Sequence, residues 1–254
     1  MMEKLEETSR DLYSLAVGFC YDLCEELDYH KSSRKYLTVD DYKVLKAYYQ
    51  ELNFRTVKYN AHSVARLLKH IIRYIMSCPQ PPRILDAGCG LGSQAIFFSL
   101  LGADVVGVDL RKKRLDIADK RVKYYQEKYN KTLHVKFYPK NILKLCEHNK
   151  FDIVWSNQSI SHIHPVQDFL EAAWKNLKNG GYLIICDSNS TNPDVAFRTW
   201  LIHRKGGVYT QVKDPDTLKL IPYARERMLN PQCLSSLLRK THYDIQLIEY
   251  HGFV

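Results

Sequence analysis

The sequence predicts an α/β fold in which a doubly wound, mostly parallel sheet carries helices on both faces and follows an N-terminal helical cap. Three observations support this prediction. The first 80 residues show only helical periodicity, short apolar strands alternate with helical segments from residue 83 onwards, and a glycine-rich turn follows the first strand. Alternation of strands with helices is typical of a parallel sheet, because parallel strands are joined by helical crossovers.

Three helices are expected within the cap, residues 1–80. Apolar side chains recur on one helical face in residues 9–28. Thr38 and Asp41 have the spacing of a capping box, with Asp in place of the usual Glu, and predict a helix start. Asn60 is expected to cap the third helix, which would end at the proline-rich stretch that follows.

A second domain is predicted over residues 81–254. The expected strands are 83–87, 104–109, 133–138, 151–156 and 182–187, with helices near 93–101, 112–129 and 166–178. Residues 188–229 are irregular in pattern, and we expect them to form an insertion that covers the substrate. Pro193 and Pro231 mark helix starts within and after this insertion, and a last strand is expected over 243–250.

The charge of the chain is unevenly distributed. The formal net charge is +9, yet residues 1–60 carry nine Lys and Arg against eleven Asp and Glu, so the remainder carries +11. A basic domain attracts nucleic acid, an anionic membrane or an acidic small molecule. The densest basic run, 111–114, also suits the solvent face of an amphipathic helix.

Hydropathy and cysteine usage predict a cytoplasmic protein without a membrane span. No apolar stretch reaches the roughly 18 residues that a span needs, and the acidic N-terminus lacks the apolar core of a signal peptide. The seven cysteines are odd in number and form no C-x-x-C pair, which argues against a disulfide framework and a zinc site. No pattern indicates the oligomeric state.

The most informative stretch, Asp86-Ala87-Gly88-Cys89-Gly90-Leu91-Gly92, begins in the first predicted strand. Glycines lack the Cβ atoms that would keep a ligand away from the backbone, and the helix that follows presents free N–H groups. About 23 residues after Asp86, the second strand ends in Asp109. A glycine turn followed by an acid at this distance is the layout that binds a nucleoside, with the acid on the ribose hydroxyls.

This stretch resembles motif I of the class I S-adenosylmethionine-dependent methyltransferases, which has the form D/E-x-G-x-G-x-G. The resemblance implies a Rossmann-like fold with S-adenosylmethionine as the cofactor. It implies Asp109 on the ribose and a negative charge from Asp86 near the amino group and the sulfonium. A dinucleotide oxidoreductase is a more distant alternative, because its glycine spacing differs. Cofactor contacts are expected from Asp86, Gly88, Cys89, Gly90, Gly92, Asp109 and Leu110.

The resemblance covers roughly residues 60–187 and extends to the ends of the third and fourth strands. Asn141 stands where the family often has an Asp that binds the adenine amino group, and an Asn can accept through its carbonyl oxygen. Ile142, beside it, is a further expected contact. The stretch 151–157 with His162 resembles the fourth motif of the small-molecule, type 11-like branch, which implies that Asn157 lines the methionine side.

His162 is the candidate catalytic base, because it follows the fourth strand on the expected cofactor side. An imidazole can take up a proton near neutral pH. A base is needed only where the acceptor must lose a proton, so a structural role at a helix start is the alternative. With His164 it forms H-x-H, but no third ligand is spaced nearby, and no metal site is predicted.

Acceptor contacts are expected from Tyr59 in the N-terminal helices and from Trp200 and Arg225 in the insertion. Arginines with aromatics suit an anionic or planar acceptor. No N-P-P-Y or D-P-P-Y follows the fourth strand, which argues against amino methylation of adenine, cytosine or glutamine by that motif. No Pro-Cys nucleophile stands there either, which argues against methylation of cytosine C5.

The resemblance therefore implies an enzyme that transfers a methyl group from S-adenosylmethionine to an oxygen or nitrogen of a small or medium-sized acceptor, anionic or aromatic in character. One alternative is an RNA methyltransferase that uses the basic surface. The other is a non-catalytic S-adenosylmethionine-binding subunit that partners another chain, because a glycine turn indicates binding and not turnover.

One departure from the family concerns the last strands. The family's sheet usually ends with an antiparallel sixth and seventh strand, whereas only 243–250 has a strand pattern here. Either another strand lies within 206–212, or the chain is a segment of something longer.

Overall fold

Five parallel strands form the central sheet of the computed structural model, which describes residues 2–28, 35–50, 55–225, 227 and 229–250. The strand order β3-β2-β1-β4-β5 reverses direction at β1, and every neighbouring pair is parallel. This arrangement confirms the predicted doubly wound sheet. The strands are β1 (Arg83–Ala87), β2 (Asp104–Asp109), β3 (Val135–Pro139), β4 (Phe151–Asn157) and β5 (Leu177–Cys186).

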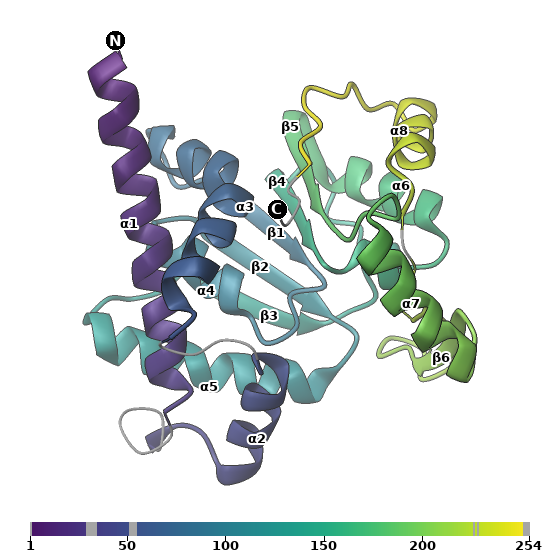
Figure 1. Cartoon of the computed structure of the whole chain (residues 1–254), viewed down its shortest axis with the longest axis horizontal. Helices are drawn as coiled ribbons and strands as arrows, with labels where there is room; N and C mark the ends of the chain where they lie inside the picture. The colour runs from purple at the N-terminus through teal and green to yellow at the C-terminus, as the bar shows by residue number, and fades with distance from the viewer. Residues whose placement is uncertain (1, 29–34, 51–54, 226, 228, 251–254) are drawn as a thin grey trace.

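Side chains of each strand alternate between two apolar layers, because successive residues of a strand point to opposite faces. Ile84 and Ile153 belong to the layer beneath α1 (Met2–Glu26), α3 (Val57–Ser77) and α4 (Ser93–Leu100). Their neighbours Leu85 and Val154 belong to the layer beneath α6 (Val166–Asn176) and α8 (Pro231–Lys240). Figure 1 shows these helix groups on the two sides of the sheet, as predicted.

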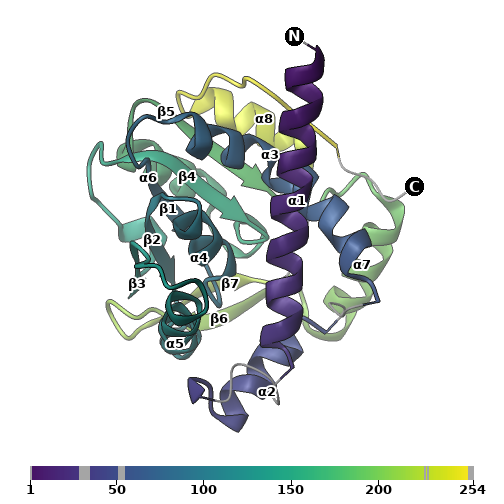
Figure 2. The ribbon, with the colours of Figure 1, turned by 90° about the vertical axis from the view of Figure 1, so that its left-hand side faces the viewer.

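The N-terminal helices share one apolar core with the sheet. Phe19 of α1 stacks on Phe97 of α4 with ring centroids 4.5 Å apart, and both belong to the layer that includes Ile84. Figure 2 shows α1 running along the length of the molecule, with α2 (Val39–Tyr48) near its C-terminal end. The capping box predicted for α2 is present: Thr38 Oγ1 accepts from the Asp41 amide at 3.2 Å and Asp41 Oδ2 from the Thr38 amide at 2.9 Å.

A fully buried ion pair ties α1 to α5 (Lys112–Tyr129). Arg121 Nε and Nη2 donate to the two carboxylate oxygens of Glu26 at 2.6 and 2.8 Å, and the exposed fractions of these side chains are 0% and 1%. Arg121 Nη1 also donates to the carbonyl of Leu91 and, at 2.7 Å, to Ser93 Oγ. The pair therefore fixes the start of α4 relative to α1 and α5.

The segment after β5 differs from the prediction. A strand does lie near 206–212, namely β6 (Tyr209–Lys213), but it pairs antiparallel with β7 (Leu220–Ala224) in a separate sheet. This hairpin follows α7 (Pro193–Gly206). The predicted strand at 243–250 was wrong: these residues have no regular secondary structure. Leu247, Ile248 and Tyr250 are exposed there, so these apolar side chains do not pack into the core as those of a sheet strand would.

Several element boundaries also differ from the predicted ones. α3 begins at Val57 after Thr56, and Asn60 lies inside its first turn with its side chain donating to Thr56 Oγ1 at 3.1 Å. β3 begins two residues later than predicted. β5 begins at Leu177, before Gly180, whose positive φ of 78° bends the strand after its first pairing with Phe151.

We expect Arg121→Met and Glu26→Gln each to lower the free energy of unfolding by about 3–5 kcal/mol, because each leaves one charge buried without its partner. Urea denaturation measures this loss. The matched control is Lys112→Ala, which removes an exposed i,i+4 pair with Asp116 and should cost less than about 1 kcal/mol. Losses as small as the control's would show that the pair does not hold α1 on α5.

Candidate functional site

The glycine turn, Gly88–Gly92, connects β1 to α4 in a conformation that favours glycine. Gly88, Gly90 and Gly92 all have positive φ, between 55° and 82°. A Cβ at Gly88 would lie 2.5 Å from Ser159 Cβ, and one at Gly90 would lie 2.8 Å from the Tyr48 hydroxyl oxygen. The turn thus forms a narrow cradle whose walls come from the loop after β4 and from α2.

Two acids stand beside this turn. Asp109 at the end of β2 accepts from the Gly90 amide at 3.1 Å through Oδ2 and from the Arg111 amide at 2.8 Å through Oδ1. Asp86 is buried, and its Oδ2 has no hydrogen-bond partner among the described residues. Burial raises the pKa of Asp86 to about 7; the nearby Asp109 adds to the shift, whereas a hydrogen bond from the Ala95 amide opposes it.

A cavity of about 700 Å³ opens at the carboxyl ends of the strands, where ligands bind in open α/β sheets. The glycine turn, the end of β2, the start of η2 (Ile142–Lys144), η3 (Ile160–His162), α7 and β7 all contribute to its lining. Seven residues predicted for the site line it: Gly88, Asp109, Leu110, Asn141, Ile142, His162 and Arg225.

Other predicted residues do not line this cavity. Trp200 lies on α7 with 51% of its side chain exposed, stacked on Phe197 with ring centroids 5.9 Å apart. Tyr59 lies within α3, but its side chain falls outside the described residues. The remaining ones belong to β1, the glycine turn and β4 and are not among the lining residues: Asp86, Cys89, Gly90, Gly92 and Asn157.

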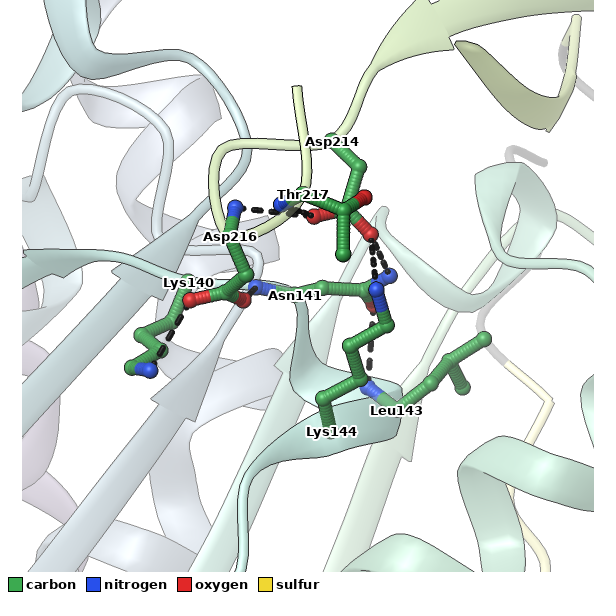
Figure 3. A network of polar contacts seen from close by, with 7 residues as sticks. All are labelled: Lys140, Asn141, Leu143, Lys144, Asp214, Asp216 and Thr217. Atoms are coloured by element: carbon green, nitrogen blue, oxygen red, sulfur yellow. Dashed lines mark hydrogen bonds and ion pairs between the residues drawn. The ribbon is translucent and has the colours of Figure 1, made fainter. Parts of the chain in front are cut away.

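Asn141 lies in a polar network that the sequence pattern did not reveal (Figure 3). Its Nδ2 donates to Asp214 Oδ2 at 3.0 Å, and its Oδ1 accepts from the Leu143 amide at 3.1 Å. Lys144 Nζ donates to the same Asp214 oxygen at 2.7 Å. Asp216 accepts from the Asn141 amide and from Lys140. The turn between β6 and β7 is thereby fastened to the end of β3.

Burial would raise the pKa of Asp214, but hydrogen bonds from Lys144, Asn141 and two backbone amides outweigh burial and hold the pKa well below its usual range. The carboxylate therefore stays ionised at neutral pH. The network uses one of the two N–H groups of the Asn141 side chain and one lone pair of its Oδ1, which leaves that oxygen able to accept a further hydrogen bond.

His162 lies in the cavity wall with a defined orientation. Its Nδ1 lies 2.9 Å from the carbonyl oxygen of Ala224, and its ring stacks on Tyr223 at a centroid distance of 5.1 Å and an interplanar angle of 6°. A carbonyl can only accept, so the proton of the neutral ring sits on Nδ1 and the lone pair on Nε2. This tautomer is the one a base acting through Nε2 requires.

The sequence analysis did not single out Tyr48, Arg111 and Arg114 as site residues, although all three line the cavity. Arg111 and Arg114 lie over the rings of Tyr223 and Tyr48, each 5.3 Å from the ring centroid. The basic run at 111–114 also suits the solvent face of a helix, and helical periodicity alone does not show which loop folds back over the helix start. Among the described residues, no group of three His, Cys, Asp or Glu side chains is arranged to hold a metal ion.

Comparison with known proteins adds to this geometry. Residues 85–185 match a family model described as "Methyltransferase domain". The ubiquinone biosynthesis O-methyltransferase of Pelagibacter ubique is 25% identical over 174 residues, covering 67% of this chain and 65% of that protein. The same-named protein of Roseobacter denitrificans is 28% identical over 185 residues, covering 70% and 67%. The chain thus spans about two thirds of the length of these relatives.

Among solved structures, the YcgJ protein of Bacillus subtilis is similar with a TM-score of 0.52 at 21% identity, over 69% of this chain and 67% of that one. A likeness at this identity concerns the fold. It agrees with the parallel five-stranded sheet.

We expect Asp86→Asn to change the pH dependence of stability of the ligand-free protein. The raised pKa means that the folded state holds a proton that the unfolded state has lost between about pH 4 and pH 7. Stability due to this group therefore falls as pH rises through that window. The difference in melting temperature between Asp86→Asn and the unaltered protein should grow in favour of the variant from pH 5 to pH 8.

Asp152→Asn is the control for this comparison, since Asp152 pairs with Lys178 at the opposite end of the sheet. A constant difference between Asp86→Asn and the unaltered protein across the pH range would contradict a titrating, buried Asp86.

Proposed function

The chain belongs to the class I S-adenosylmethionine-dependent methyltransferase family, and we propose its function on that basis. The enzyme transfers a methyl group from S-adenosylmethionine to an oxygen or nitrogen of a small or medium-sized acceptor. The observation that carries this proposal is the cradle: a glycine turn between two acids, opening into the cavity at the strand ends.

The residues fit the cofactor. The positive φ angles favour glycine at Gly88 and Gly90, where a Cβ would clash with Ser159 or Tyr48. Gly88 lines the cavity, so the backbone of the turn can contact a ligand there. The unpaired Oδ2 of Asp86 is a buried acceptor whose ionised form a nearby cation would stabilise. We propose that Asp109 holds the ribose, that Leu110, Asn141 and Ile142 surround the adenine, and that Asn157 lies toward the methionine side.

S-adenosylmethionine supplies a methyl group on a positively charged sulfur that is already a good leaving group. What remains for the protein is to hold the acceptor atom in line and to exclude water, which can account for much of the rate acceleration. We propose that His162 accepts the acceptor's proton through Nε2 where the acceptor is a hydroxyl. Its stacking on Tyr223 and its contact with Ala224 fix the direction of that lone pair.

The domain roles stay proposals. In the N-terminal helices, Tyr48 contributes to the cavity wall, which supports a cap within residues 1–80. In residues 188–229, α7 and β7 contribute to the lining, which supports a substrate cover there. Arg225 is the predicted acceptor contact that lies in the lining, and contacts from Tyr59 and Trp200 stay predictions.

The described helices include none that is both long and apolar enough to cross a bilayer. We propose a cytoplasmic location, supported by seven cysteines that are all free thiols in the structure.

Calorimetric titration with S-adenosylmethionine, S-adenosylhomocysteine and NAD tests the cofactor assignment. We expect both adenosyl ligands to bind with micromolar affinity and NAD not to bind. Asp109→Ala should weaken both strongly, because it removes the acid expected to hold the ribose and the acceptor that holds the Gly90 amide. Asp104→Ala, at the other end of β2, is the matched control. Unchanged affinity in Asp109→Ala would show that Asp109 does not hold the ribose. Binding of NAD without either adenosyl ligand would show that the protein does not use S-adenosylmethionine.

For His162→Ala we expect turnover to fall by about 10²–10⁴-fold, as for loss of a general base, while the affinity for S-adenosylhomocysteine changes little. The measurement is methyl transfer from labelled S-adenosylmethionine to an acceptor found by screening. If turnover equals that of the unaltered enzyme, His162 has a structural role only.

A further inference from the structure

We propose that the acceptor carries a dianionic oxyanion group, such as a phosphate or a pair of carboxylates, and that Arg198 and Arg225 bind this group. The inference rests on the proposed function, because it assigns the part of the cavity that the cofactor does not use.

The lining holds many more positive than negative side chains. Lys140 lines it too, but its charge is paired with Asp216 at 2.8 Å. The one acidic residue is Asp109, whose carboxylate already accepts two backbone amides. Within the described part of the chain, none of the five lining arginines forms an ion pair with an acid: Arg111, Arg114, Arg198, Arg225 and Arg227.

The cofactor does not balance this charge. S-adenosylmethionine has a sulfonium, an ammonium and one carboxylate, so it brings a net positive charge into the same cavity. Like charges in a partly desolvated cleft repel one another more strongly than in water. A cavity of about 700 Å³ lies within the upper part of the range of small-molecule sites and has room for a second molecule. A negatively charged acceptor is therefore the occupant that the electrostatics favour.

Three of the five arginines are held by the protein itself. Arg111 and Arg114 lie flat over the rings of Tyr223 and Tyr48. Arg227 donates through Nη2 to the carbonyl of Ile163 at 2.7 Å, and its buried Nε has no partner among the described residues. These three set a fixed positive field in the cavity wall.

Arg198 and Arg225 are differently placed. Both residues are exposed while lining the cavity, and among the described residues neither guanidinium forms a hydrogen bond, an ion pair or a ring contact. A guanidinium presents a planar fork of donors that matches a carboxylate or phosphate group. These two arginines are therefore available to bind an oxyanion in the cavity.

The backbone links these arginines to His162. The Ala224 carbonyl contacts the His162 ring, and Arg225 is the next residue. The Arg225 carbonyl in turn lies 2.7 Å from His203 Nε2 of α7, the helix that carries Arg198. An oxyanion bound between Arg198 and Arg225 would thus lie in one rigid frame with the candidate base, which is the positioning that a transfer reaction needs.

The arginines line a recessed cavity, and this favours a small acidic acceptor over RNA. Nucleic acid binding depends on a basic surface that follows a phosphate backbone and weakens steeply with salt. The test below therefore includes RNA as a competitor for the same arginines.

The test is calorimetric titration of the protein, with and without saturating S-adenosylhomocysteine, using inorganic phosphate and the dicarboxylate succinate as probes. We expect at least one probe to bind at a ratio of one per chain, and the two arms tell phosphate from carboxylate recognition. Arg198→Gln/Arg225→Gln should bind that probe at least tenfold more weakly. The control is Arg66→Gln/Arg73→Gln, which removes the same charge from exposed positions on α3 and should bind as the unaltered protein does.

Three outcomes would overturn the proposal. Failure of both probes to bind, or equal weakening in the two double variants, would show that no oxyanion site exists at Arg198 and Arg225. A single-stranded RNA 20-mer that displaces the probe and binds more tightly would assign the arginines to nucleic acid. Failure of S-adenosylhomocysteine to bind removes the proposed function instead, and the titration without it still decides whether the oxyanion site exists.

Discussion

The buried pair between Arg121 and Glu26 is the interaction on which the site geometry depends. A guanidinium without access to water needs a partner for its charge and for its N–H groups. Glu26 of α1 supplies the charge, and the carbonyl of Leu91 with Ser93 Oγ supplies acceptors at the start of α4. The same side chain therefore holds together α1 (Met2–Glu26) and the end of the glycine turn.

This constraint makes the N-terminal helices part of the site. α1 and α3 pack in the same apolar layer as β1 and β4, while α2 places Tyr48 against Gly90 and into the cavity wall. The Lys120–Asp41 ion pair, at 2.6 Å, fastens α2 to α5 near the buried pair. The position of the glycine turn thus follows from contacts between segments that are about 90 residues apart in the chain, as the Arg121–Glu26 hydrogen bonds show.

Features that depend on neighbouring residues could be predicted from the sequence. The capping box at Thr38, the glycine turn and the five sheet strands all follow from local patterns of turn chemistry and apolar alternation. Features that depend on distant contacts could not. The partner of Asn141 is Asp214, 73 residues away, and the pairing of β6 with β7 outside the main sheet depends on where that turn is fastened. The 243–250 pattern looked like a strand, but Tyr243 packs on the layer beneath α6 and α8 whereas Leu247, Ile248 and Tyr250 stay exposed.

The β6–β7 hairpin links the two halves of the cavity. At its turn, Asp214 and Asp216 fasten it to Asn141, beside the region expected to hold the adenine. At the end of β7, Tyr223 stacks on His162 and the Ala224 carbonyl orients the same ring. A shift of the hairpin at either end would therefore move the candidate base and Arg225 together. Because the ionised Asp214 is held by four donors, the hairpin has a defined resting position, and the acceptor side of the cavity is organised before a ligand arrives.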